Sequence, residues 1–239
     1  MVSAHDDRRS ARPANVKPPI ALLGGTFDPV HNGHIGLADD VRRALGLDEV
    51  RLVPAGAPPH RGGPAASGQD RVAMLRLAVS GHPSLVVDAR EVEREGKSYT
   101  VLTLEELARE APGRPIIVIV GADAFLGFPT WHRWRDIFEL AHVVVAARPG
   151  TELEFDGELA KEWNSRLAGT PEGLFSTPAG IIYQQAITPQ PISATVIRAQ
   201  LARGAAGRDA VRQMLSPAVL RYIDQHHLYS DQAHTQDAT

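Results

Sequence analysis

The sequence predicts an α/β protein built on a doubly wound parallel sheet, followed by a small C-terminal helical unit. Short runs of Val, Ile and Leu alternate with amphipathic helical patterns, which is typical of parallel strands joined by crossover helices. After residue 187 the pattern is helical only. Open α/β sheets bind ligands at the carboxyl ends of their strands, so the residues that follow a strand are the first candidates for a site.

Each element is expected from its own pattern. Continuous apolar runs bounded by turn residues predict strands, at residues 19–24, 49–54, 84–89, 115–120, 142–147 and 180–187. Apolar residues at helical spacing predict helices between them, at residues 35–45, 69–80, 103–110 and 134–140. The C-terminal helical unit is expected to contain helices at residues 193–203, 207–215 and 217–227.

The 239 residues are enough for one full hydrophobic core. We expect an α/β core at residues 18–190 and the helical unit at 191–229, with disordered tails at 1–17 and 230–239.

Two segments interrupt the alternation of strands and helices. Residues 55–68 are rich in Pro, Gly and Ala and predict a loop, whose closure on a substrate is left open. Residues 151–177 carry a short acidic helix and then turn residues, and their role is also left open.

Composition excludes several classes of protein. A net charge of −3 gives no general attraction to nucleic acid or to an anionic membrane. The absence of cysteine excludes disulfides and thiolate metal sites and fits a reducing compartment. The polar first 17 residues lack the apolar segment of a signal peptide, and the most apolar stretch is shorter than the roughly 20 residues that span a bilayer. A cytoplasmic protein is therefore expected.

The stretch GGTFDPVHNGHIG, residues 24–36, carries the first functional signal. It joins a predicted strand to a predicted helix, an arrangement in which main-chain N–H groups and the helix dipole face a phosphate. Gly24 and Gly25 let the main chain approach a ligand closely. His31 and His34 are three residues apart, so both can project from the first turn of a helix that begins near Asn32.

Other interpretations of this stretch are weaker. The histidines could be structural, or they could be zinc ligands, but zinc needs a third ligand and the helical metalloprotease motif uses a different spacing. A dinucleotide-binding G-x-G-x-x-G motif and a Walker Lys-Ser/Thr pair are both missing from the sequence. Phosphate binding is the favoured interpretation.

Together with a second stretch, this motif resembles the nucleotidyltransferase superfamily, whose Rossmann-like members transfer an adenylyl or cytidylyl group onto a phosphate. The second stretch is ISATVIR, residues 192–198, which is similar to the superfamily motif I-S-S-T-x-[IV]-R. Ala194 departs from that motif and removes one hydroxyl. Ser193 is still expected as a helix N-cap and Thr195 as a hydrogen-bond donor. The guanidinium of Arg198 is expected to bind phosphate through two N–H groups. On its own, the second motif would be equally compatible with an ordinary capped helix.

Further segments resemble bacterial nicotinate-nucleotide adenylyltransferases in the order expected of that family. They are PPHR (58–61), GKSYTVLTLEEL (96–107), GADAF (121–125), WHRWRDI (131–137), ARPG (147–150) and YIDQHHLY (222–229). The resemblance covers the chain apart from the tail and residues 151–177.

The resemblance implies an acceptor site for a pyridine nucleotide. Trp131 offers an indole face for the pyridine ring, whereas Trp134 lies at helical spacing with Ile137 and is expected in the core. Tyr99 and Thr100 precede a helix, so main-chain N–H groups there can accept the carboxylate of nicotinate and disfavour nicotinamide.

The resemblance also implies an ATP site. Its expected residues are Gly24, Gly25, Thr26, Phe27, Gly121, Asp123, Ser193 and Thr195. Asp123 is expected to meet hydroxyl groups rather than phosphates, because its charge would repel them. The alternative is that Asp123 caps the following helix.

The implied reaction joins ATP and nicotinate mononucleotide to give nicotinate adenine dinucleotide and pyrophosphate, as in NAD biosynthesis. His31, His34 and Arg198 are the expected catalytic residues, and Mg²⁺ is expected to be held mainly by ATP and water. The alternatives are a nicotinamide-mononucleotide or phosphopantetheine adenylyltransferase, or a non-catalytic nucleotide-binding protein. An NAD-dependent oxidoreductase is disfavoured by the missing glycine motif, and the oligomeric state is left open.

Overall fold

The computed structural model describes residues 17–56, 64–188 and 190–230. Six strands form one sheet in the order β3-β2-β1-β4-β5-β6, the order of the doubly wound nucleotide-binding fold. The strands are β1 (Ile20–Gly25), β2 (Val50–Pro54), β3 (Leu85–Val87), β4 (Ile116–Gly121), β5 (His142–Ala147) and β6 (Ile182–Ala186). The predicted fold class is confirmed, and the predicted strand bounds differ only at their ends.

The pairs β1–β4, β4–β5 and β5–β6 are parallel. Ile20 of β1 pairs with Ile116 of β4, and Ala147 of β5 pairs with Ala186 of β6. Every residue of β5 is buried. Strands that are covered on both faces are continuously apolar, which is why this strand was readable from the sequence.

The predicted helices are present with shifted ends: α1 (Asn32–Ala44), α2 (Gly68–Val79), α4 (Thr100–Glu110), α6 (Asp136–Leu140), α9 (Ala194–Leu201), α10 (Ala205–Val211) and α11 (Pro217–Gln225). Several short elements were not predicted, namely α3 (Arg90–Glu93), α5 (Ala122–Leu126), η2 (Phe128–Thr130) and α8 (Gly173–Ser176). The predicted starts at 35 and 103 were too late and that at 134 too early. The apolar repeat that predicted α1 begins only at Ile35, after a polar first turn.

The chain divides into two compact units that are interleaved in sequence. The first unit comprises residues 1–24, 38–51 and 99–188, and the second comprises residues 25–37, 52–98 and 189–239. The expected boundary at residue 190 stays a prediction. Both predicted tails, apart from residues 17 and 230, lie outside the described residues, as does the 57–63 part of the predicted loop.

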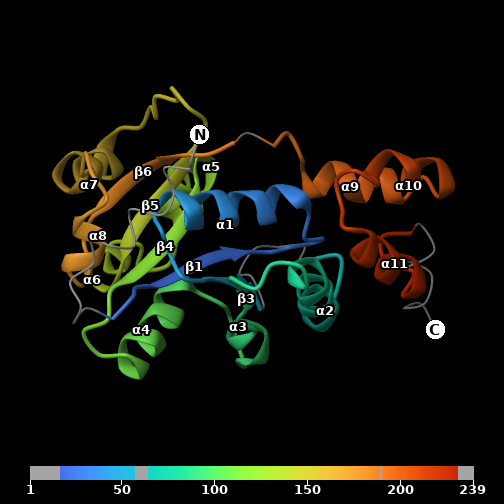
Figure 1. Ribbon diagram of the computed structural model, residues 1–239, viewed down its shortest axis with the longest axis horizontal. Coiled ribbons are helices and arrows are strands. Elements are labelled where there is room, and N and C mark those ends of the chain that lie inside the picture. Colours follow the sequence, from blue (N-terminus) through green and yellow to red (C-terminus); the bar gives the residue numbers. More distant parts are fainter. Residues whose placement is uncertain (1–16, 57–63, 189, 231–239) are drawn as a thin grey trace, which may run out of the picture. The chain divides into compact units, whose positions relative to one another are not determined.

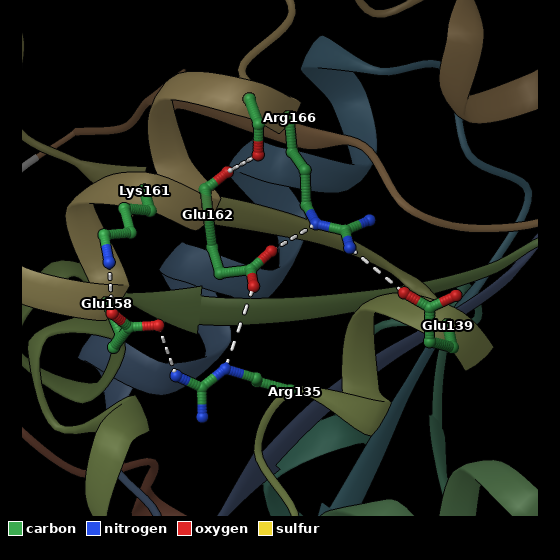
Figure 2. Close-up of polar contacts among 7 residues, drawn as sticks. Arg135, Glu139, Glu158, Lys161, Glu162 and Arg166 are labelled. Atoms are coloured by element: carbon green, nitrogen blue, oxygen red, sulfur yellow. Dashed lines mark hydrogen bonds and ion pairs between the residues drawn. The ribbon is translucent and has the colours of Figure 1, made fainter.

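In the first unit, β4, β5 and β6 lie side by side (Figure 1). The predicted helix within residues 151–177 is α7 (Gly157–Arg166). Its Glu158 accepts a hydrogen bond from Arg135 at 2.8 Å, and Arg166 donates to Glu139 at 3.0 Å (Figure 2). Ion pairs therefore link α7, within the 151–177 segment, to the residues around α6.

In the second unit, α2 packs against β3 and α11 packs against α2. Tyr222 on α11 donates a hydrogen bond to Asp70 on α2 at 2.9 Å. Arg71, the next residue on α2, is 1% exposed. In the described part of the chain, no helix is long and apolar enough to cross a membrane.

Candidate active site

The turn that follows β1 is shaped by Phe27. This residue has a φ of 50° and is 1% exposed, and a left-handed conformation is costly for a residue other than glycine. A Cβ atom on Gly25 would lie 3.1 Å from the Phe27 ring. Gly25 therefore makes room for the buried Phe27 ring, and its predicted close approach to a ligand stays a prediction. At Gly24, no described residue lies within 4 Å of the position of a Cβ atom.

His31 and His34 lie directly after this turn, at the start of α1. Their rings stack with centroids 3.7 Å apart and planes 20° apart. Phe27 packs against the other imidazole edge-on: its ring centroid lies 5.0 Å from that of His34. The main-chain N–H of His31 donates to Nδ1 of His34 at 3.3 Å. In the neutral ring the proton is then on Nε2, which leaves Nε2–H as a donor.

Burial keeps both imidazoles neutral at physiological pH. It lowers the pKa of His31 from 6.5 to about 4. Burial, and secondarily the neighbouring His31, lowers the pKa of His34 to about 3. The pair can therefore offer hydrogen bonds to a phosphate but not a positive charge.

The two histidines differ in exposure. His31 is 7% exposed, and its Nδ1 is buried without a partner among the described residues. A Cβ atom on Gly33 would lie 3.0 Å from that Nδ1. His34 is only partly buried. His34 is thus the more accessible of the two predicted phosphate ligands.

The second motif forms the start of α9 and meets the first. Ser193 is the N-cap residue by position, but its side chain makes no capping hydrogen bond. Nη1 of Arg198 donates to the main-chain oxygen of Asp28 at 2.7 Å, and its Nη2 donates to Oγ1 of Thr195 at 3.4 Å. The two motifs, far apart in the sequence, therefore meet through this 2.7 Å contact.

Asp28 is a buried centre of hydrogen bonding that the sequence did not reveal. Its carboxylate accepts hydrogen bonds from the main-chain N–H groups of Ala65 at 2.7 Å and Ala66 at 3.1 Å. Tyr229 donates its hydroxyl to Oδ1 of Asp28 at 2.7 Å. The carboxylate is also 3.9 Å from Nη1 of Arg198.

Arg71 fixes the same turn from the side of α2. Its guanidinium donates to the main-chain oxygens of Thr26 at 2.8 Å and Gly56 at 3.1 Å. The Thr26 side chain itself is exposed. Two arginines, Arg71 and Arg198, therefore hold the main chain of the first motif.

The other predicted ATP-binding residues belong to the first unit. Gly121 ends β4 and is the N-cap of α5. Asp123 lies exposed in the first turn of α5. Because Gly121 occupies the N-cap position, Asp123 is not the capping residue of the alternative interpretation, and its contact with hydroxyl groups stays a prediction.

The predicted acceptor residues also belong to the first unit. Tyr99 is the N-cap of α4 and Thr100 its first residue. Trp131 is half-buried and lies on Phe128, with ring centroids 4.5 Å apart. The ring centroid of the next residue, His132, lies 4.3 Å from that of Tyr99. The two predicted acceptor segments are therefore neighbours.

Trp134 behaves as the sequence predicts for a core residue. It is 8% exposed and lies edge-on to the buried Phe138, with centroids 6.2 Å apart. The two tryptophans of WHRW thus have different environments.

A family comparison agrees with these two motifs. The model of the cytidylyltransferase-like family matches residues 22–200, which include both of them. A probable nicotinate-nucleotide adenylyltransferase of Dechloromonas aromatica is 49% identical over 215 residues, covering 88% of this chain and 97% of the relative. The chain belongs to the nicotinate-nucleotide adenylyltransferase family.

Other members of the family and a solved structure agree. A probable nicotinate-nucleotide adenylyltransferase of Aeromonas hydrophila is 43% identical over 214 residues, covering 90% of this chain and 98% of the relative. The fold is similar to that of the Plasmodium falciparum nicotinic acid mononucleotide adenylyltransferase complexed with NaAD. That comparison has a TM-score of 0.69 at 15% identity and covers 89% of this chain and 98% of the other.

Several residues of this nicotinate-nucleotide adenylyltransferase fold went unnoticed in the sequence. Asp28 and Tyr229 lie inside quoted motifs but had no assigned role, and Arg71 resembled a solvated helix residue. His132 lies next to the predicted Trp131. Contacts between residues far apart in sequence decide these positions, so local pattern carries little signal for them.

Proposed function

We propose that this protein transfers the adenylyl group of ATP to nicotinate mononucleotide, releasing pyrophosphate and forming nicotinate adenine dinucleotide. The observation that carries the proposal is the meeting of the two nucleotidyltransferase motifs through Arg198 and Asp28. The identity of 42–49% to relatives named for this reaction, over 83–95% of the chain, supports the same acceptor.

The chemistry needs no protein nucleophile. A phosphate oxygen of the mononucleotide attacks the α-phosphorus of ATP, a new P–O bond forms, and the bond to the bridging oxygen of pyrophosphate breaks. The attacking phosphate is already anionic, so no strong general base is required. Catalysis then consists of positioning the reactants and stabilising charge.

His34 is assigned to the charge that develops on the phosphates. Its Nδ1 is occupied by the His31 main-chain N–H, so its Nε2–H is the group that donates to a phosphate oxygen. A neutral donor with a fixed tautomer needs no reorganisation during the reaction, which is the basis of electrostatic preorganisation.

Arg198 is assigned as the cation of the site. Nη1 is held by the Asp28 main-chain oxygen and Nη2 contacts Thr195, so the plane of the guanidinium is set from the protein side. Its side chain remains 32% exposed. A guanidinium held in this way can still present N–H groups to a phosphate in a forked geometry.

Mg²⁺ is proposed to enter as a complex with ATP. Among the described residues, no group of three His, Asp or Glu side chains is suitably placed to hold a metal ion. Phosphate oxygens and water are the usual ligands of Mg²⁺ in such cases. The ion would neutralise part of the triphosphate charge, while His34 and Arg198 contact the phosphates.

Trp131, Tyr99 and Thr100 are assigned to the acceptor. The Trp131 indole lies against Phe128 and is half-exposed, which leaves surface for stacking a pyridine ring. Main-chain N–H groups at the start of α4 can accept a carboxylate. This favours nicotinate over nicotinamide, because an amide would point its own N–H groups toward those donors.

The direct test is product identification. Purified protein is incubated with ATP, Mg²⁺ and nicotinate mononucleotide, and the products are separated by chromatography. Formation of nicotinate adenine dinucleotide and pyrophosphate in equal amounts supports the proposal. Binding of ATP without any product would support the alternative of a non-catalytic nucleotide-binding protein.

A further inference from the structure

We propose that Tyr229 is a positioning residue that holds Asp28 and thereby keeps Arg198 available for the nucleotide. This inference rests on the proposed function for the identity of the nucleotide. It concerns a contact between residues that lie 201 positions apart in the sequence.

Tyr229 reaches Asp28 from the C-terminal segment. Its side chain follows α11 and is partly buried, and its hydroxyl donates to Oδ1 of Asp28 at 2.7 Å. Burial, followed by the charge of Asp28, raises the pKa of the Tyr229 phenol. The phenol therefore remains protonated and remains a donor throughout the physiological range.

Hydrogen-bond donors surround the Asp28 carboxylate. The carboxylate is 5% exposed, and a buried carboxylate needs its lone pairs occupied by donors. Ala65 and Ala66 supply main-chain N–H groups, and Tyr229 supplies its hydroxyl. Nη1 of Arg198 lies farther away, at 3.9 Å from Oδ2.

The contact of Tyr229 with Asp28 has a consequence for Arg198. With Tyr229 in place, Nη1 of Arg198 donates to the main-chain oxygen of Asp28 rather than to its carboxylate. Without the Tyr229 hydroxyl, the Asp28 carboxylate has one donor fewer, and the guanidinium of Arg198, whose Nη1 is 3.9 Å from Oδ2, is a cation that can move toward it. A guanidinium drawn into an ion pair with Asp28 is less available to phosphate.

The chain supplies a matched control on the same C-terminal segment. Tyr222 also donates its hydroxyl to a carboxylate, that of Asp70, at 2.9 Å. Asp70 lies in the first turn of α2 and is partly exposed. Tyr222→Phe therefore removes the same kind of hydrogen bond from the same segment without touching the first motif.

The experiment compares Tyr229→Phe and Tyr222→Phe with the parent protein by calorimetric titration with Mg-ATP and, separately, with nicotinate mononucleotide. We expect Tyr229→Phe to weaken ATP binding by about tenfold or more, in the range for a hydrogen bond to a charged group. Mononucleotide binding should change by less than about twofold, and Tyr222→Phe should bind ATP like the parent. Equal ATP affinities for the two phenylalanine variants would overturn the inference.

A double-mutant cycle tests whether the effect passes through Arg198. In an Arg198→Lys background, Tyr229→Phe should reduce ATP affinity much less than it does in the parent. Full additivity would contradict the proposed route. Should Tyr229→Phe fail to fold in thermal melts, Tyr229→Leu, which also lacks the hydroxyl, should give the same selective loss of ATP affinity, and unchanged affinity would overturn the inference.

These binding measurements separate this inference from the proposed function. ATP affinity is measured without an acceptor, so it reports on Tyr229 even if another acceptor is the true substrate. Failure of product formation in the parent would count only against the adenylyl transfer to nicotinate mononucleotide.

Discussion

The main-chain N–H of His31 donates to Nδ1 of His34 at 3.3 Å, while the two imidazole rings stack with centroids 3.7 Å apart. One histidine thus fixes the tautomer and the orientation of the other. The donor that remains on His34 is Nε2–H, and the proposed chemistry depends on it.

Removing that donor should slow the reaction more than it weakens binding. We expect His34→Ala to lower kcat by about a hundred- to a thousandfold, because a donor to developing charge contributes about 2.7–4 kcal/mol. Steady-state kinetics with ATP and nicotinate mononucleotide measure the change. His82→Ala, in the turn after α2, is the control and should keep parental kinetics. A loss in His34→Ala of less than about threefold would make His34 a structural residue.

The protonation of the pair can be observed directly by NMR. The pKa values of about 4 for His31 and about 3 for His34 predict that neither ring titrates between pH 5.5 and 8. A histidine model peptide, which titrates near 6.5, supplies the external control. A midpoint above about 6 for His34 would contradict the neutral-donor mechanism.

The same pKa values predict how stability depends on pH. Unfolded histidines take up protons as the pH falls through about 6.5, whereas His31 and His34 resist protonation in the folded protein until about 4 and about 3. Their contribution to the free energy of unfolding is therefore present above pH 6.5 and is lost progressively toward pH 4. Urea denaturation across this range should show a smaller decline for His34→Asn than for the parent. An equal decline in the free energy of unfolding for His34→Asn and the parent would contradict the lowered pKa of His34.

The contribution of the planar guanidinium of Arg198 can be measured separately from that of its charge. Arg198→Lys retains the charge but loses the two-sided contact with Asp28 and Thr195. We expect kcat/KM for ATP to fall about tenfold, which corresponds to about 1.4 kcal/mol. Arg203→Lys, at an exposed position just beyond α9, should leave this constant unchanged. An unchanged KM and kcat in Arg198→Lys would rule out a forked contact with phosphate.

The two tryptophans of WHRW should respond differently to truncation. Trp131→Ala should raise KM for nicotinate mononucleotide by the loss of about 1–3 kcal/mol of stacking, with KM for ATP nearly unchanged and partial recovery in Trp131→Phe. Trp134→Ala should instead destabilise the fold by about 3–5 kcal/mol, because Trp134 is buried. Thermal melts and kinetics for both substrates distinguish these outcomes. A parallel loss for both substrates with a lower Tm in Trp131→Ala would defeat the stacking role.

The sequence was most informative where a local pattern determines the structure. Strands such as β4 and β5 are buried along almost their whole length, so an unbroken apolar run was sufficient to locate them. Helix starts were missed because the first turns of α1 and α4 precede the apolar repeat. One-turn helices such as α3 and α5 are too short to show a repeat.

The residues that support the first motif could not be predicted in this way. Arg71 lies on a helix, and a charged residue there usually faces solvent. Its burial follows from the main-chain oxygens of Thr26 and Gly56, which local sequence does not place beside it. The pairing of Asp28 with Tyr229 is likewise a product of the tertiary fold.

Pyrophosphate release with ATP most directly tests adenylyl transfer to nicotinate mononucleotide. It is measured with three acceptors in separate reactions: nicotinate mononucleotide, nicotinamide mononucleotide and phosphopantetheine. We predict the highest kcat/KM with nicotinate mononucleotide, because the main-chain donors at the start of α4 favour a carboxylate. The central claim would be contradicted by no release with nicotinate mononucleotide, or by a higher kcat/KM with either of the other acceptors.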